Sequence, residues 1–178
     1  MWSGRGRLWQ TVRMKTEPKL AQPKPSGIKL KHILVPIDFS PLSKKAMHYA
    51  LRLAEEFGAE VKLLHVTEPQ VPPAFDGFMM TSPATAGRND ASCASRLKTL
   101  ARSGQTGAVA QVDSCVRSGL PEYEIVDAAK ELDVDLIVMS THGYTGWKHF
   151  AIGSTAERVV RAAPCPVLVV REKEHEFI

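Results

Sequence analysis

One stretch of the chain, residues 135–155, combines the residue types and the spacing that a phosphate site needs. Its apolar run Leu136–Met139 predicts a strand that is buried on both faces. The loop that follows contains three glycines: Gly143, Gly146 and Gly153. Ser154 then precedes an apolar-periodic segment, which predicts the start of a helix. A phosphate could bind here, because glycines let the backbone approach a ligand and the first N–H groups of a helix are unpaired.

An ordinary structural role explains the same residues. Ser154 followed three residues later by Glu157 is a capping box, in which the serine caps the helix without any ligand. Gly143 and Gly146 are equally typical of turns. Because a single glycine loop is a weak signal, phosphate binding and simple capping both remain open on these residues alone.

Asp38 is the second candidate for chemistry. It follows the apolar run Ile33–Ile37 and so lies at the carboxyl end of a predicted buried strand, where doubly wound sheets bind their ligands. The alternative is a local role, in which the carboxylate accepts hydrogen bonds from nearby backbone N–H groups of a turn.

The sequence does not support other kinds of chemistry. The three cysteines, Cys93, Cys115 and Cys165, are widely spaced and form neither a metal-ligand pair nor a disulfide framework, so reduced thiols are expected. The histidines form no H-E-x-x-H pattern, and neither a P-loop nor a nucleophile elbow is found. His142 could act as an acid or base near a phosphate, although an ordinary loop histidine is the alternative. No catalytic residue and no metal ligand are predicted.

The positive charge is confined to the N-terminal segment. The 178 residues have a net charge of +4, but residues 1–27 hold six basic residues and one acidic residue, so residues 28–178 carry a net −1. We predict a disordered basic tail over residues 1–27 and one domain over residues 28–178. A nearly neutral domain does not favour a nucleic-acid partner. With no membrane-length apolar run and no signal-peptide pattern, we expect a cytoplasmic protein.

The predicted elements alternate between strands and helices. Ser40 and Pro41 predict the cap and the first position of a helix that Gly58 ends, and residues 69–90 are predicted as a long loop. The predicted strands are Ile33–Ile37, Val61–Val66, Val109–Val116, Leu136–Met139 and Val167–Val170, and the later helices are Ala91–Ser103, Pro121–Leu132 and Thr155–Ala162. This order predicts an α/β fold, a Rossmann-like or flavodoxin-like open sheet of five parallel strands with helices on both faces.

The chain resembles the universal stress protein family. The matching segments are Ile33–Ser40, Leu63–Val66, Gly119–Pro121, Asp135–Gly143 and Gly153–Val170. The resemblance implies the strand order 3-2-1-4-5 and a homodimer. Some members bind ATP through the motif G-x2-G-x9-G-[ST]. In this sequence nine residues separate Gly143 from Gly153 and Ser154 follows, whereas Ser140 stands at the first glycine position.

The resemblance also implies a nucleotide site at the carboxyl end of the sheet. Asp38 and the backbone of Val66 would hold the adenine end, and Met139 and Ser140 would line the ribose. The phosphates would be held by Gly143, Gly153, Ser154 and Thr155. Pro36 and Ile37 complete the predicted nucleotide-binding set. The implied ligand is ATP, with AMP, ADP and an accompanying magnesium ion left open.

Three functions remain open. The first is a stress-response regulatory protein that binds an adenine nucleotide, and the second is a ligand-free dimeric interaction module. The third is a slow ATPase, for which the sequence shows no dedicated base to activate water. The homodimer is predicted to form through Val167–Val170, because this run would be an edge strand without the lysine, proline or charge that usually protects an edge.

Overall fold

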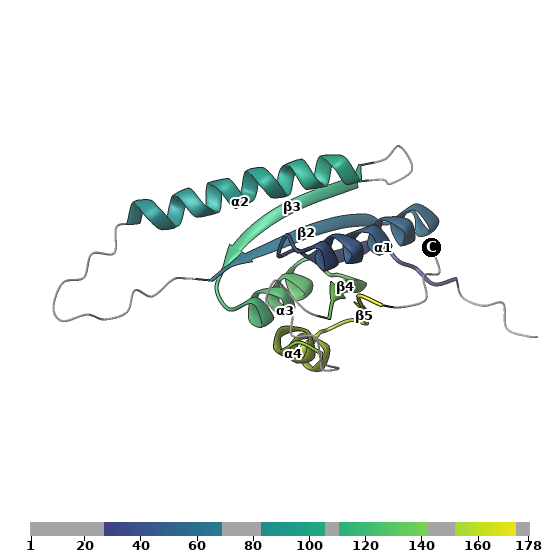
Figure 1. Cartoon of the computed structure of the whole chain (residues 1–178). Coiled ribbons are helices and arrows are strands. Elements are labelled where there is room, and N and C mark those ends of the chain that lie inside the picture. The colour runs from purple at the N-terminus through teal and green to yellow at the C-terminus, as the bar shows by residue number, and fades with distance from the viewer. Residues whose placement is uncertain (1–26, 69–82, 106–110, 142–151, 174–178) are drawn as a thin grey trace, which may run out of the picture.

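The structure is a computed structural model that describes residues 27–68, 83–105, 111–141 and 152–173. The predicted tail, apart from Gly27, and most of the predicted loop 69–90 lie outside these residues. The elements, drawn in Figure 1, are β1 (His32–Pro36), α1 (Pro41–Phe57), β2 (Glu60–Thr67), α2 (Pro83–Gly104), β3 (Gln111–Ser118), α3 (Pro121–Glu131), β4 (Leu136–Ser140), α4 (Ser154–Ala162) and β5 (Val167–Val170).

The five strands form one parallel sheet in the order β3-β2-β1-β4-β5. β1 lies at the centre, where Leu34 is in register with Lys62 of β2 and with Ile137 of β4. Helices α1 and α2 cover one face of the sheet, and α3 and α4 cover the other (Figure 1). The predicted fold class and strand order are confirmed.

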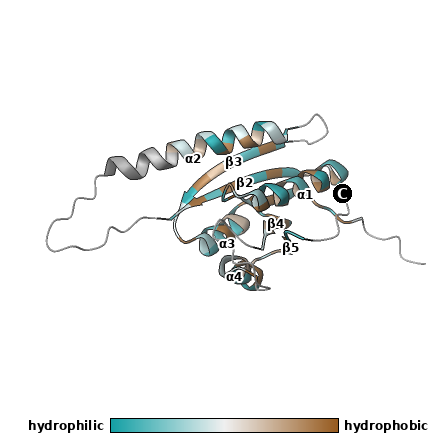
Figure 2. Ribbon diagram, in the orientation of Figure 1, coloured by the Kyte–Doolittle hydropathy of each residue, from teal (hydrophilic) through white to brown (hydrophobic). Residues whose placement is uncertain are grey.

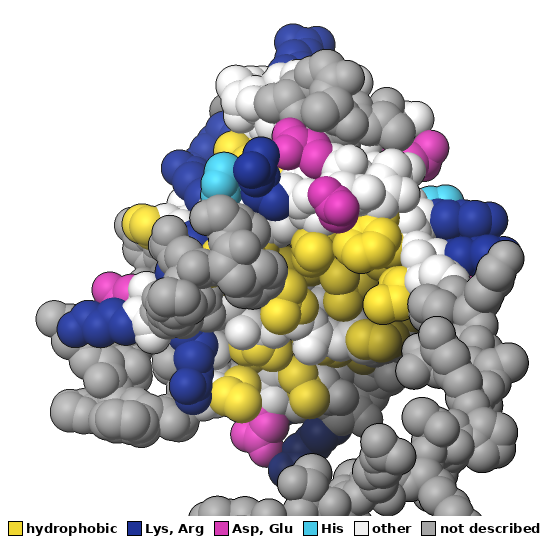
Figure 3. Space-filling model, turned by 90° about the vertical axis from the view of Figure 1, so that its right-hand side faces the viewer, with side chains coloured by type: hydrophobic (Ala, Val, Ile, Leu, Met, Phe, Trp, Pro, Cys, Tyr) yellow, Lys and Arg dark blue, Asp and Glu magenta, His cyan; other side chains and the backbone are white. Residues whose placement is uncertain are grey.

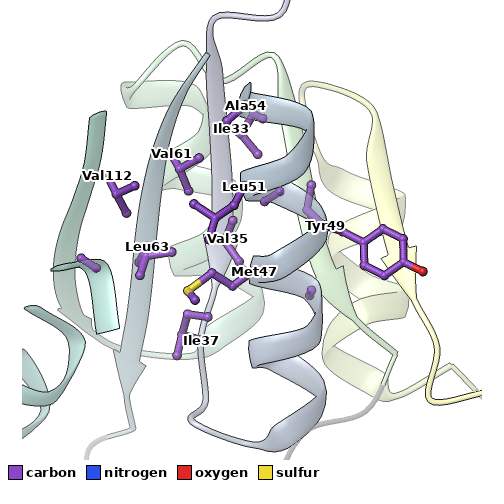
Figure 4. Packing of buried hydrophobic residues seen from close by; sticks show 14 of the residues in the cluster. Ile33, Val35, Ile37, Met47, Tyr49, Leu51, Ala54, Val61, Leu63 and Val112 are labelled. Carbon is purple, nitrogen blue, oxygen red and sulfur yellow. The ribbon is translucent and has the colours of Figure 1, made fainter. Parts of the chain in front are cut away.

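Alternate residues of the central strand point into two separate cores. Ile33 and Val35 pack against α1, as Figure 4 shows, and belong to the same core as residues of α2, whereas Leu34 packs with α3 and α4. All three side chains are at most 1% exposed, as expected for a parallel strand that helices cover on both sides. The helices in Figure 2 carry both hydrophilic and hydrophobic residues, which is the composition of amphipathic helices that cover a sheet.

Helix α1 begins and ends as its sequence predicts. The side chain of Ser40 accepts a hydrogen bond from the Ser43 N–H at 3.1 Å, and Pro41 occupies the first helical position. Gly58 closes the helix with a left-handed φ of 68°, and its N–H bonds to the Ala54 carbonyl. These caps fix where the chain leaves β1 and where it enters β2.

Several element boundaries differ from the prediction, those of α2 and β3 by more than one residue. Helix α2 starts at Pro83, although residues 69–90 were predicted as a loop, because its first two turns consist of small and polar residues without an apolar period. Strand β3 runs from Gln111 to Ser118, so it continues two residues beyond the predicted end at Val116, in register with Val66 and Thr67 of β2. None of the helices in the described part of the chain is long and apolar enough to cross a membrane.

Candidate functional site

The candidate site lies at the carboxyl edge of the sheet, where the central strands β1 and β4 end side by side. Extending the register of Leu34 with Ile137 brings Ile37 and Ser140 to the same level. The chain continues from β1 to β2, which pairs with one edge of β1, and then to β3, whereas β4 pairs with the opposite edge of β1. This makes the crevice between β1 and β4 the topological switch point of the sheet, where open α/β folds bind ligands.

Asp38 lies two residues after the end of β1, and its two oxygen atoms differ in their surroundings. The Oδ1 atom accepts the Ser40 N–H at 3.0 Å and closes a tight turn. The Oδ2 atom is buried and has no hydrogen-bond partner among the described residues. Because a buried acceptor without a donor is costly, Oδ2 suits a ligand that brings an N–H or O–H group.

Asp38 stays ionised in the folded protein. Burial on its own raises the pKa of this carboxyl, but the Ser40 and Ser43 hydroxyls and the Ser40 N–H favour the charged form more strongly. The pKa of Asp38 therefore lies below its ordinary value. The carboxylate is an acceptor at neutral pH rather than a donor.

The end of β4 is tied to the start of α4 by a backbone hydrogen bond. The Gly153 N–H donates to the Thr141 carbonyl at 2.8 Å, and the Thr141 N–H donates to the Val170 carbonyl at 3.0 Å. Gly153 thus lies against the end of β4, although eleven residues separate it from Thr141 in the chain. Nothing in the local sequence indicated this role for Thr141, because the bond depends on how the loop closes.

Helix α4 begins one residue earlier than predicted, and the predicted capping box is wrong. Gly153 is the N-cap residue and Ser154 is the first residue of the helix, so among the described residues no side chain caps this end. The first bond of the helix runs from the Glu157 N–H to the Gly153 carbonyl at 2.9 Å. The N–H groups of the first turn, with the positive end of the helix dipole, are left to a partner outside the helix.

Two ion pairs adjust the charge around α4. Glu157 in its first turn is paired with Arg161 one turn later, at 2.9 Å, which offsets a negative charge close to the helix start. Arg158 is paired with Glu122, whose side chain is buried at the start of α3. The backbone N–H of Glu122 and the Arg158 guanidinium hold the pKa of the Glu122 carboxyl below its ordinary value. This second pair joins α4 to α3.

The residues predicted for the nucleotide set gather at this edge, with one exception. Pro36 ends β1 and is followed by Ile37 and Asp38, Val66 lies near the end of β2, Met139 and Ser140 end β4, and Gly153 is the N-cap residue of α4, which Ser154 and Thr155 begin. The exception is Gly143, which lies outside the described residues. The sequence reasoning did not single out Phe39, His65 or Arg96, which form a cluster next to Asp38.

A pocket of about 200 Å³ lies at the opposite, amino edge of the sheet. It is lined by His32, Lys62 and Asp113 among others, but Lys62 is already paired with Asp113. The His32 ring is bonded to the Asp133 carbonyl at 3.2 Å. Because these polar groups already have partners within the protein, this pocket offers less to a ligand than the carboxyl edge does.

The described residues do not favour metal or thiol chemistry of their own. Among them, no three His, Cys, Asp or Glu side chains are grouped closely enough to hold a metal ion. All three cysteines are free, and burial raises the pKa of Cys115 and of Cys165. Both therefore stay as thiols rather than as reactive thiolates.

Comparison with known proteins gives a consistent picture. The family model described as "Universal stress protein family" matches residues 29–171. The universal stress protein MJ0531 of Methanocaldococcus jannaschii is 35% identical over 149 residues, which cover 82% of this chain and 85% of that protein. The solved structure of MJ0577, from the same organism, has a TM-score of 0.71 at 26% identity and covers 83% of this chain and 100% of its own.

Two further solved structures are titled as nucleotide complexes. A universal stress protein in complex with cAMP has a TM-score of 0.62 at 18% identity, and covers 82% of this chain and 100% of its own. The Archaeoglobus fulgidus universal stress protein in complex with dAMP has a TM-score of 0.55 at 20% identity, and covers 80% of this chain and 99% of its own. At such identities these two structures share the fold with this chain. Together with the sheet order and the extent of the family match, the comparisons lead to one conclusion: this chain belongs to the universal stress protein family.

Proposed function

We propose that this protein is a stress-response regulatory protein that holds an adenine nucleotide, ATP or AMP, at the carboxyl edge of its sheet. The observation that carries the proposal is the Gly153–Thr141 hydrogen bond. It sets the start of α4, which no described side chain caps, directly against the end of β4, so that one anion-binding group and one acceptor, Asp38, flank the switch-point crevice.

Each end of a nucleotide finds a suitable group in this arrangement. The buried Oδ2 of Asp38 would accept a hydrogen bond from the base, next to the backbone of Val66, Pro36 and Ile37. Met139 and Ser140 would line the ribose. The N–H groups of Ser154 and Thr155, with Gly143 and Gly153, would hold the phosphates. A magnesium ion would then be bound mainly by the phosphates and water, as is common for this ion.

Family membership supports the proposal without deciding it. Structural relatives with this fold are titled as complexes with cAMP and dAMP, which are both adenine nucleotides. This chain has the motif residues Gly153 and Ser154 at the start of α4, which favours a phosphate-bearing ligand here as well. We favour a protein that holds its nucleotide over one that hydrolyses it. Hydrolysis would need a catalytic base to activate water, and the Asp38 carboxylate is assigned here to binding the adenine.

The experiment that tests the proposal is the release of bound nucleotide. The purified full chain is denatured, and the extract is separated by chromatography and identified by mass spectrometry. We expect an adenine nucleotide in the extract. An extract without any adenine nucleotide would favour the alternative function, a ligand-free interaction module.

We also propose that the protein acts as a homodimer formed through β5. In the described part of the chain β5 pairs only with β4, so its outer edge is open. Val167, Leu168 and Val169 are partly exposed, and Val160 on the neighbouring α4 is 46% exposed. Figure 3 shows apolar side chains gathered on one face of the molecule and bordered by charged ones. A second copy could cover such a surface through a twofold contact.

The remaining assignments stay proposals. The three free cysteines fit a reducing compartment, so we place the protein in the cytoplasm. Residues 1–27 are proposed to be a dispensable basic tail, because they lack the apolar residues that would offset the entropy of ordering them.

A further inference from the structure

Phe39, the residue directly after Asp38, has an unusual backbone. Its φ is 65°, in the left-handed region that bulky side chains rarely adopt. A residue in such a conformation is strained and persists only where its surroundings fix it. The structure must therefore contain contacts that hold Phe39 in place.

Two side chains from other elements supply those contacts. The His65 ring of β2 lies 4.7 Å from the Phe39 ring, centroid to centroid, and tilted by 49°. The guanidinium carbon of Arg96, on α2, lies 4.1 Å from the centroid of the Phe39 ring, within the range of a cation–π contact. Phe39 also packs against the core formed with α1 and α2.

The cluster is anchored to the end of β1. The Nδ1 atom of His65 lies 2.7 Å from the Ile37 carbonyl oxygen. Because a carbonyl can only accept, His65 Nδ1–H is the donor in this bond. Ile37 and Phe39 are the two chain neighbours of Asp38, so His65 holds one of them by a hydrogen bond and contacts the ring of the other.

The same turn determines the direction of the Asp38 carboxylate. Phe39 is the middle residue of the turn that the bond from the Ser40 N–H to Asp38 Oδ1 closes. With Oδ1 engaged there, Oδ2 is the atom left for a ligand. If the Phe39 backbone relaxed to negative φ, the Asp38–Ser40 bond would be disturbed and Oδ2 would lose its direction.

We infer that Arg96, acting through Phe39, is a positioning residue for Asp38 and thereby sets how tightly the base end of the nucleotide is held. The inference rests on the proposed function, since it assigns Asp38 to the base. It makes α2 part of the site, although Arg96 is separated from Asp38 by more than fifty residues and sequence reasoning gave it no role. The cation–π contact is the element of the cluster that can be removed without opening a core.

The first test compares Arg96→Gln with Arg96→Lys and with Arg102→Gln. Arg102 is exposed on the last turn of the same helix and serves as the matched control. Calorimetry measures the affinity for ATP and for inorganic tripolyphosphate. We expect Arg96→Gln to weaken ATP binding about five-fold, the size of one exposed cation–π contact, and to leave tripolyphosphate binding unchanged. Arg96→Lys should be intermediate because it keeps the charge but not the planar stack. Arg102→Gln should match the original chain.

A double-mutant cycle separates positioning from direct contact. In an Asp38→Asn background, Arg96→Gln should cause almost no further loss of ATP affinity, because its effect passes through the carboxylate. An equal loss in both backgrounds, or an equal loss for tripolyphosphate, would overturn the inference and make Arg96 a direct contact to the ligand. An unchanged ATP affinity in Arg96→Gln would overturn it as well.

A readout without ligand separates this inference from the proposed function. Amide hydrogen exchange of Ser40, followed by NMR on the free protein, reports the Asp38–Ser40 bond directly. We expect faster exchange at Ser40 in Arg96→Gln and unchanged exchange in Arg102→Gln. If the original chain binds no nucleotide but Ser40 responds in this way, the positioning of Asp38 stands and the proposed function fails. Unchanged exchange at Ser40 would show that Arg96 does not fix the turn.

Discussion

At the scale of single residues, the candidate site depends on polar groups that the fold leaves without partners. Asp38 presents a buried oxygen atom, and the start of α4 presents N–H groups that no side chain in the described part of the chain caps. The Asp38 oxygen opposes stability in the absence of a ligand, because a buried polar atom without a partner is costly. Polar groups without partners are common at the sites where proteins bind ligands.

A substitution at Ser140 tests how closely the ribose of a nucleotide approaches β4. It stands where the family motif has its first glycine, and its side chain is half-buried at the strand end. We expect Ser140→Gly to bind ATP as tightly as the original chain or more tightly, because the substitution removes a hydroxymethyl group from the approach. Calorimetric titration checks this. A clear loss of affinity would show that the Ser140 hydroxyl is itself a contact.

At the scale of elements, α4 has to be held in a fixed position if its start is to serve as a binding group. The Gly153–Thr141 bond ties it to β4, and the Arg158–Glu122 pair ties it to α3. Ala156 and Val159 bury its inner face in the second core. The helix is short, so these tertiary contacts rather than helix propensity must keep it in place.

Removing Arg158 should loosen that attachment. Arg158→Ala leaves the buried Glu122 carboxylate without its cation, and we expect a loss of about 1 kcal/mol in the free energy of unfolding. Arg161→Ala is the control on the same helix, because the Arg161–Glu157 pair is exposed on both sides and should contribute less than about 0.5 kcal/mol. Urea unfolding of both variants makes the comparison. Equal losses would mean that the Glu122 pair does not secure α4.

The elements that the sequence predicted well are those with local signals. Ser40, Pro41 and Gly58 marked both ends of α1, and the run Val167–Val170 marked β5 to the residue. The start of α2 was missed because its first two turns carry no apolar period. The capping box was wrong because the Thr141–Gly153 bond, between residues far apart in the loop, decides which residue caps α4. The cluster at Phe39 joins three elements, and no local pattern predicts such a contact.

At the scale of the whole molecule, the sheet order separates two surfaces. The carboxyl edge holds the candidate site, and the open side of β5 provides the proposed dimer contact. β5 is parallel to β4 and pairs with it from Val167 to Val170, so its partner in a second copy would have to pair along the free side. The basic tail over residues 1–27 remains a prediction from the sequence.

The dimer predicts a definite mass in solution. Sedimentation equilibrium at micromolar concentration should give a species of twice the 19.6 kDa of one chain. Val169→Lys places a charge on the edge strand, which protects edges from pairing, and should shift the distribution to the monomer. A monomer for the original chain, or a dimer that Val169→Lys leaves intact, would show that β5 is not the contact.

The central claim is that a nucleotide binds against the start of α4, and calorimetric titration with ATP of the original chain and of Gly153→Val tests it most directly. Gly153 has φ −57° and ψ 150°, a conformation open to other residues, so the added side chain tests space rather than backbone strain. We predict binding by the original chain and at least a ten-fold weaker affinity in the variant, about 1.4 kcal/mol, with an unchanged circular dichroism spectrum. No measurable heat with the original chain, or equal affinity in both proteins, would contradict the claim.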